Sequence, residues 1–97
     1  MLTGSQRTRL RGLAHGYRPA VQIGKGGLTD SVVAAIDAAL TASELVKVQI
    51  FTARAERQHI SEAIEGRLKC ECAGSVGRMA IFYRRQADPE KRRIDIG

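Results

Sequence analysis

The stretch VQIGKGGLTD, residues 21–30, carries the clearest structural signal in this 97-residue chain. A short apolar run leads into glycines around a lysine, and Thr29 can then cap a helix that begins at Asp30. A strand that passes through a glycine loop into a helix leaves backbone N–H groups unpaired at the loop, where the helix dipole favours negative charge. The sequence therefore predicts a strand–loop–helix unit that can hold an anion.

The flanking segments predict a small α/β domain. Apolar spacing favours helices at residues 5–15 (capped by Ser5 or Thr3), 30–42 and 55–68, and strands at residues 20–23, 45–51, 70–76 and 79–83. Gly77-Arg78 predicts a hairpin between the last two strands. The order α-β-α-β-α-β-β predicts a mixed four-stranded sheet, parallel across the helical connections and antiparallel at the hairpin. The strand order stays open.

The end of the chain differs in composition from the rest. Residues 1–85 read as one compact domain, whereas residues 86–97 contain Pro89 and the basic run 91–93. Such a segment is typical of a mobile or loosely docked basic tail, and we expect one here.

Positive charge points to a polyanionic partner. Sixteen Lys and Arg stand against ten Asp and Glu, a net charge of +6, and arginine forks onto phosphate better than lysine does. The basic residues gather at residues 7–18, at Lys25 and at residues 84–93. A solvated surface with excess charge is the alternative explanation. Four aromatic residues are too few for base stacking to be the main mode of binding.

Several classes of protein are disfavoured by composition. No apolar run is long enough to span a membrane and the first residues lack the apolar core of a signal peptide, so we expect a cytoplasmic protein. Cys70 and Cys72 are expected to be reduced thiols, since a disulfide between residues two apart on a strand would be strained. A metal site would need His15 or His59 to join them, and we expect neither metal nor cofactor.

The glycine loop fits none of the common nucleotide-binding motifs. A nucleoside-triphosphatase loop needs a lysine followed by Ser or Thr, and a dinucleotide fingerprint needs a third glycine where Thr29 stands. The alternatives left are a plain turn and a G-x-x-G clamp on nucleic-acid backbone, the device of KH-type modules. In the clamp, Lys25 reaches phosphate while the N–H groups of Gly26, Gly27 and Leu28 cradle it.

No catalytic constellation is evident in the sequence. His15 and His59 have no nucleophile partner nearby, and Glu62 and Glu65 lie among basic neighbours that favour ion pairing over acid–base work. We therefore expect no enzyme and no small-molecule substrate, and a nucleotide-binding enzyme is disfavoured by the motif mismatch.

Several blocks of this sequence resemble the CRM domain, the chloroplast splicing and ribosome maturation domain, whose bacterial form is the YhbY family. The likeness runs in order from about residue 2 to 85, through Leu10–His15, Arg18-Pro19, Ile23–Thr29, Glu44–Val48 and Gly77–Arg84. It implies a fold similar to the C-terminal domain of translation initiation factor three and RNA binding through the G-x-x-G loop. Bacterial single-domain members are associated with precursors of the large ribosomal subunit, and plant members with group II intron splicing.

The resemblance and the charge pattern together give a set of candidate RNA-binding residues. Gly24, Lys25, Gly26 and Gly27 match the family's loop, Arg11, His15 and Arg18 its basic first segment, and Lys47 its second-strand lysine; Arg78 stands where many members have Lys. Charge adds Arg7 and Arg84 to the electrostatic track, and Leu28 joins as a backbone donor.

Two functions follow as hypotheses. The first is a monomeric RNA-binding factor for ribosomal RNA and large-subunit (pre-50S) assembly that performs no chemistry of its own. The second is a protein-interaction module, or a minor ribosome-associated component, without direct RNA specificity.

Overall fold

The computed structural model describes residues 1–96 and has the predicted α-β-α-β-α-β-β order. Its elements are α1 (Gly4–Ala14), β1 (Val21–Ile23), α2 (Asp30–Ser43), β2 (Leu45–Ile50), α3 (Arg54–Leu68), β3 (Glu71–Val76), β4 (Met79–Tyr83) and a 3-10 turn, η1 (Pro89–Lys91). The α/β prediction is confirmed, and each expected helix or strand end lies within one residue of the observed one.

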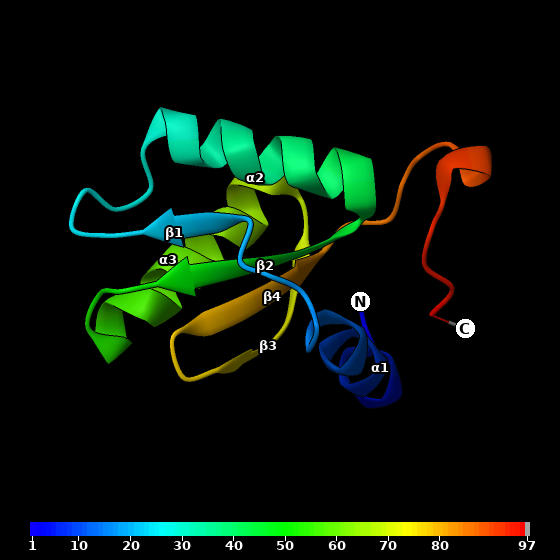
Figure 1. The fold of residues 1–97 in the computed structure, drawn as a ribbon, viewed down its shortest axis with the longest axis horizontal. Helices are drawn as coiled ribbons and strands as arrows, with labels where there is room; N and C mark the ends of the chain where they lie inside the picture. Colours follow the sequence, from blue (N-terminus) through cyan, green and yellow to red (C-terminus); the bar gives the residue numbers. More distant parts are fainter. Residues whose placement is uncertain (97) are drawn as a thin grey trace.

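The four strands form one mixed sheet in the order β1-β2-β4-β3. β1 runs parallel to β2, and β4 runs antiparallel to both of its neighbours. The C-terminal ends of β1 and β2 therefore lie at the same end of the sheet as the β3–β4 turn (Figure 1). That turn is Gly77-Arg78, flanked by the pair Val76 and Met79, and Gly77 has a left-handed φ of 58°.

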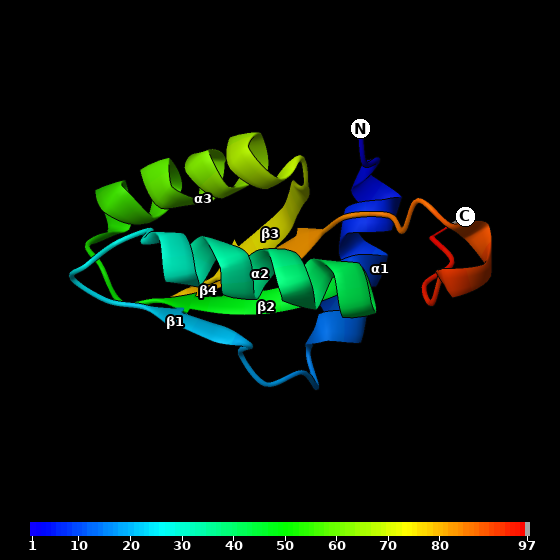
Figure 2. The same ribbon diagram turned by 90° about the horizontal axis from the view of Figure 1, so that it is seen from above.

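Both faces of the sheet are apolar because successive strand residues point to opposite sides. Val46, Val48 and Phe82 belong to the core beneath α2 and α3. Leu45, Ile81 and Tyr83 belong to a second core with Leu10 and Ala14 of α1. α1 lies toward one end of the long axis, and the β1–α2 loop lies at the other end in both views (Figure 1, Figure 2).

Side-chain caps fix where the first two helices begin. Thr3 forms a capping box with Gln6 at α1, so Thr3 rather than Ser5 is the cap. Thr29 caps α2 by accepting from the Val32 N–H at 3.3 Å, as the sequence predicts. The cap position of α3 is Ala53, whose side chain offers no acceptor.

A buried carboxylate fastens the C-terminal segment. Glu44 ends α2 in a left-handed conformation (φ 65°) and is 1% exposed. Its carboxylate accepts hydrogen bonds from the backbone N–H groups of Gln86, Arg93 and Ile94. Burial alone would raise the pKa of Glu44, but these donors outweigh burial and the pKa is lowered.

Residues 86–96 thus lie docked on the domain in this structure, where the sequence led us to expect a mobile or loosely docked tail. Beyond the bonds to Glu44, Ile94 and Ile96 pack against the α1-side core. The sequence did not reveal this docking because Glu44 lies more than 40 residues before its partners and looks like an ordinary helix-end glutamate.

Cys70 lies in the core beneath α2 and α3, Cys72 is half-buried against that core, and both thiols are free. Burial raises the pKa of the Cys70 thiol to about 11 and also raises that of Cys72, so burial favours the protonated thiol at both positions. Over residues 1–96, no three His, Cys, Asp or Glu side chains are grouped to hold a metal ion. None of the helices in this range is long and apolar enough to cross a membrane.

Candidate nucleic-acid interface

The β1–α2 loop stands open at one end of the molecule (Figure 1). Gly24, Lys25 and Gly26 are exposed, and Gly27 and Leu28 are half-buried. A Cβ added at Gly24 would meet nothing within 4 Å, and one at Gly26 only the Thr29 methyl at 3.8 Å. Gly27 differs, because its φ of 68° is left-handed. The fold therefore requires a glycine at position 27 but not at 24 or 26, so those two leave room for an outside group.

One of the three expected backbone donors is used inside the loop. The Gly27 N–H donates to the Gly24 carbonyl at 3.0 Å, closing a turn around Lys25. Among the described residues, no hydrogen bond takes up the N–H of Gly26 or Leu28. A phosphate cradle here thus has two backbone donors rather than three, and the exposed Lys25 belongs to the same loop.

An acidic residue borders the loop without closing it. Asp30 begins α2 with a fully exposed side chain, and its carboxylate lies 3.6 Å from the guanidinium of Arg67. An exposed pair of this kind is weak, so it reduces the negative charge near the loop only in part. The Thr29 cap fastens the last residues of the loop to the first turn of α2.

Three predicted contacts lie away from the loop, around the link between α1 and β1. Lys47 donates from Nζ to the His15 carbonyl at 3.4 Å, and Arg18 is exposed within the link. Ile50 of β2 pairs with Ile23, the last residue of β1, where the glycine loop begins. Lys47 comes three residues before Ile50 and therefore lies about 10 Å from it along β2. These residues form a basic region of their own at the start of β1.

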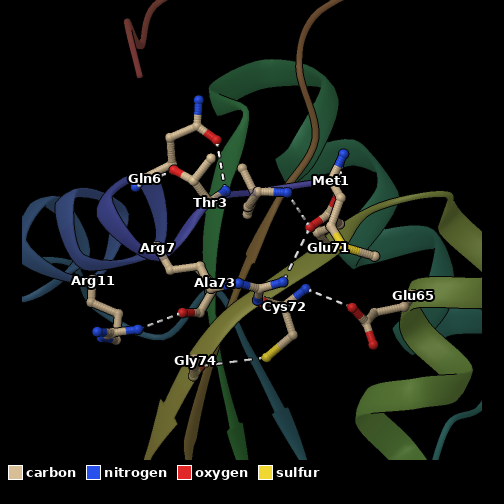
Figure 3. A network of polar contacts seen from close by, with 11 residues as sticks. Met1, Thr3, Gln6, Arg7, Arg11, Glu65, Glu71, Cys72, Ala73 and Gly74 are labelled. Atoms are coloured by element: carbon tan, nitrogen blue, oxygen red, sulfur yellow. Dashed lines mark hydrogen bonds and ion pairs between the residues drawn. The ribbon is translucent and has the colours of Figure 1, made fainter. Parts of the chain in front are cut away.

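Arg7 and Arg11 are used to attach α1 to β3 (Figure 3). The Arg7 guanidinium donates to the Cys72 carbonyl and contacts the carboxylate of Glu71, and Arg11 donates to the Ala73 carbonyl at 2.9 Å. The stem of Arg11 crosses Gly74 so closely that a Cβ there would lie 2.7 Å from Arg11 Cδ. Both guanidiniums therefore hold the fold together far from the loop.

Arg84 is also engaged within the protein. Its guanidinium contacts the Asp37 carboxylate at 2.7 Å, and it donates to the Leu68 carbonyl at 3.0 Å and the Thr41 hydroxyl at 2.9 Å. It thereby joins the end of β4 to α2 and α3. The structure does not bring Arg84 to the glycine loop.

Three basic residues stand nearer the loop than most of the candidates, and the sequence draws attention only to Arg78 among them. Arg54 and Arg57 begin α3, directly after β2, and Arg78 lies in the β3–β4 turn. All three lie at the end of the sheet where the glycine loop begins. Parallel β1 and β2 beside antiparallel β4 bring these connections to one end of the sheet, and the sequence left that strand order open.

Comparison with known proteins gives the family of this chain. Residues 2–84 match the CRS1/YhbY (CRM) domain. The chain belongs to this family. The match covers all of α1–α3 and β1–β4 and leaves out only the first residue and the C-terminal segment. The glycine loop, the α1–β3 attachment and the β3–β4 turn therefore all lie inside the CRM domain.

Similar proteins of comparable length carry names that refer to RNA binding. The chain is 31% identical over 97 residues to the "Probable RNA-binding protein YqeI" of Bacillus subtilis, covering 99% of each chain. It is 38% identical over 84 residues to an "RNA-binding protein" of Haemophilus influenzae, covering 86% of this chain and 85% of that one. A solution structure from Staphylococcus aureus superposes with a TM-score of 0.82 at 31% identity, over 98% of this chain and 100% of the other.

Proposed function

We propose that this protein binds the backbone of structured ribosomal RNA at the open glycine loop and thereby assists assembly of the large ribosomal subunit. The observation that carries the proposal is the loop itself. A side chain at Gly24 or Gly26 would point into open space, the N–H groups of Gly26 and Leu28 are unpaired within the part of the chain that the structure describes, and Lys25 is exposed in the same loop. Family membership and the names of the relatives support RNA as the ligand.

Binding of this kind needs positioning and charge rather than a reaction. The N-terminus of α2 and two loop amides provide directed donors for a phosphate oxygen, and Lys25 provides a point charge on a flexible stem. Absence of a Cβ at positions 24 and 26 lets the RNA backbone approach the protein backbone. The loop therefore recognises the sugar–phosphate chain and not the bases.

Sedimentation of cell extracts tests the assembly role. The proposal expects the protein to migrate with immature large subunits, to be depleted from mature particles, and to be released by RNase. Crosslinking in cells, mapped to nucleotides, should then give ribosomal RNA positions. Co-migration with mature particles that survives RNase would contradict the proposal and favour a protein-interaction module.

A further inference from the structure

A second basic site opens beside the glycine loop, in a cleft between α3 and the β3–β4 turn. Its volume is about 160 Å³. The polar side chains that line it come from the first two turns of α3 and from the hairpin: Arg54, Arg57, Gln58, Ser61, Ser75 and Arg78.

The charges in this cleft are not balanced by the protein. Three guanidiniums line it, and no aspartate or glutamate does. Elsewhere Arg7, Arg67 and Arg84 each have a carboxylate partner, but no ion pair within residues 1–96 involves Arg54, Arg57 or Arg78. Arg57 is held in place by its bond to the Thr52 carbonyl at 2.9 Å. Like charges held together without a counter-charge favour an anionic ligand.

The cleft and the glycine loop lie on opposite sides of the end of β2. The Phe51 N–H donates to the Ile23 carbonyl at 2.9 Å, next to Gly24, and the Ile50 N–H donates to the Arg78 carbonyl at 2.8 Å. The loop and Arg78 are thus two strand spacings apart, about 10 Å. Phe51 lies between them, 47% exposed, with the Arg78 guanidinium 5.9 Å from its ring centroid.

We propose that this cleft binds a phosphate of the same RNA strand that the glycine loop holds, with the strand passing over the exposed ring of Phe51. This inference rests on the proposed function, because it extends the RNA path from the loop. Arg54 and Arg78 fork onto the phosphate oxygens, while Ser61 and Ser75 donate from their hydroxyls. A base can stack on Phe51 as the strand crosses the end of β2.

The size of the cleft favours a strand phosphate over a free nucleotide. Pockets that enclose whole small molecules are commonly about 300–1,000 Å³, larger than the 160 Å³ found here. A single phosphate with part of its sugar fits that volume, and the rest of the strand lies outside. The remaining length of RNA then reaches the loop.

Affinity for a fluorescein-labelled RNA hairpin with a single-stranded tail, measured over a series of KCl concentrations, tests the cleft. We expect Arg54→Gln with Arg78→Gln to weaken binding about tenfold and to flatten the salt slope by about 0.7–1. The matched control is Arg85→Gln with Lys91→Gln, which removes the same charge from exposed positions at the other end of the molecule. The control should weaken binding by less than about threefold.

The possible failures are distinguishable. If Lys25→Ala weakens binding while the cleft variant equals its control, the cleft proposal is overturned and the proposed function stands. If the wild-type protein does not bind the hairpin RNA, the proposed function itself is overturned, and the cleft proposal with it. Thermal unfolding of each variant, compared with wild type, shows whether a lost affinity reflects a lost fold.

A second measurement needs no variant. Amide chemical shifts of Ser61, Ser75 and Arg78 in the wild-type protein are followed during titration with the hairpin RNA and, separately, with inorganic phosphate. The proposal expects shifts at these amides with RNA, at the same RNA concentrations that shift the amides of Gly26 and Leu28. Shifts with inorganic phosphate and none with RNA would show that the cleft binds a free anion, and would overturn the proposal.

Discussion

Gly24 and Gly26 are glycines that the protein's own packing does not require, whereas Gly27 is one that its backbone does require. The first two have open space where a side chain would begin, and the third has a φ of 68°. Stability and RNA affinity should therefore respond differently to the same substitution at neighbouring positions. This separation distinguishes a ligand-binding loop from a plain turn.

We predict that Gly24→Ala and Gly26→Ala leave the free energy of unfolding unchanged or raise it by up to about 1 kcal/mol. Each should nevertheless weaken RNA binding about tenfold, because the new methyl group occupies the space of the approaching backbone. Denaturant unfolding and fluorescence anisotropy measure the two quantities. Gly27→Ala is the comparison, since it should cost about 1 kcal/mol of stability through its left-handed backbone.

Arg84 should affect stability more than RNA affinity, because its guanidinium is bonded to other groups of the protein. Arg84→Gln should lower the free energy of unfolding by about 2 kcal/mol, since it removes a charged pair and leaves the Leu68 carbonyl without this donor. RNA affinity of the folded variant should change less than in Lys25→Ala. A normal melting curve with strongly reduced RNA binding would instead place Arg84 in the interface.

Glu44 makes the end of α2 into an anchor for the last residues of the chain. Its lowered folded-state pKa means that the carboxylate contributes stability at pH values above its ordinary 4.5, and that this contribution is lost as the pH falls through the folded value. The docked segment is thus linked to acid stability through one side chain.

We predict that wild-type stability falls more steeply below pH 4.5 than that of Glu44→Gln. At neutral pH the variant should be less stable by about 1–2 kcal/mol, because a neutral amide accepts more weakly than a carboxylate and keeps a single acceptor oxygen. Thermal unfolding across this pH range gives both comparisons. Parallel pH profiles for the two proteins would show that Glu44 does not anchor the segment.

Across the molecule, local patterns were enough for the elements but not for their arrangement. Alternation in β2, the apolar spacing of α2 and the Thr29 cap are short-range signals, and each predicted element is present. The strand order and the docking of Ile94 and Ile96 depend on contacts between distant residues. The spacing of apolar residues along the chain does not indicate which distant segments contact one another.

The candidate site divides in the same way. The glycine loop is a continuous motif, so the sequence alone names its residues as candidates. Arg54, Arg57 and Arg78 come from two separate connections and meet only because of the strand order. Charge suggested Arg7 and the family resemblance suggested Arg11, and nothing in the sequence shows that their guanidiniums are bonded to β3 carbonyls.

The salt dependence of RNA affinity for wild type and Lys25→Ala is the most direct test of the loop as a phosphate-binding site. Each phosphate contact adds about 0.7–0.9 to the slope of log K against log salt. We predict that Lys25→Ala lowers that slope by about one and weakens binding at every salt concentration, with stability unchanged. An affinity and slope identical to wild type would contradict the assignment of the loop.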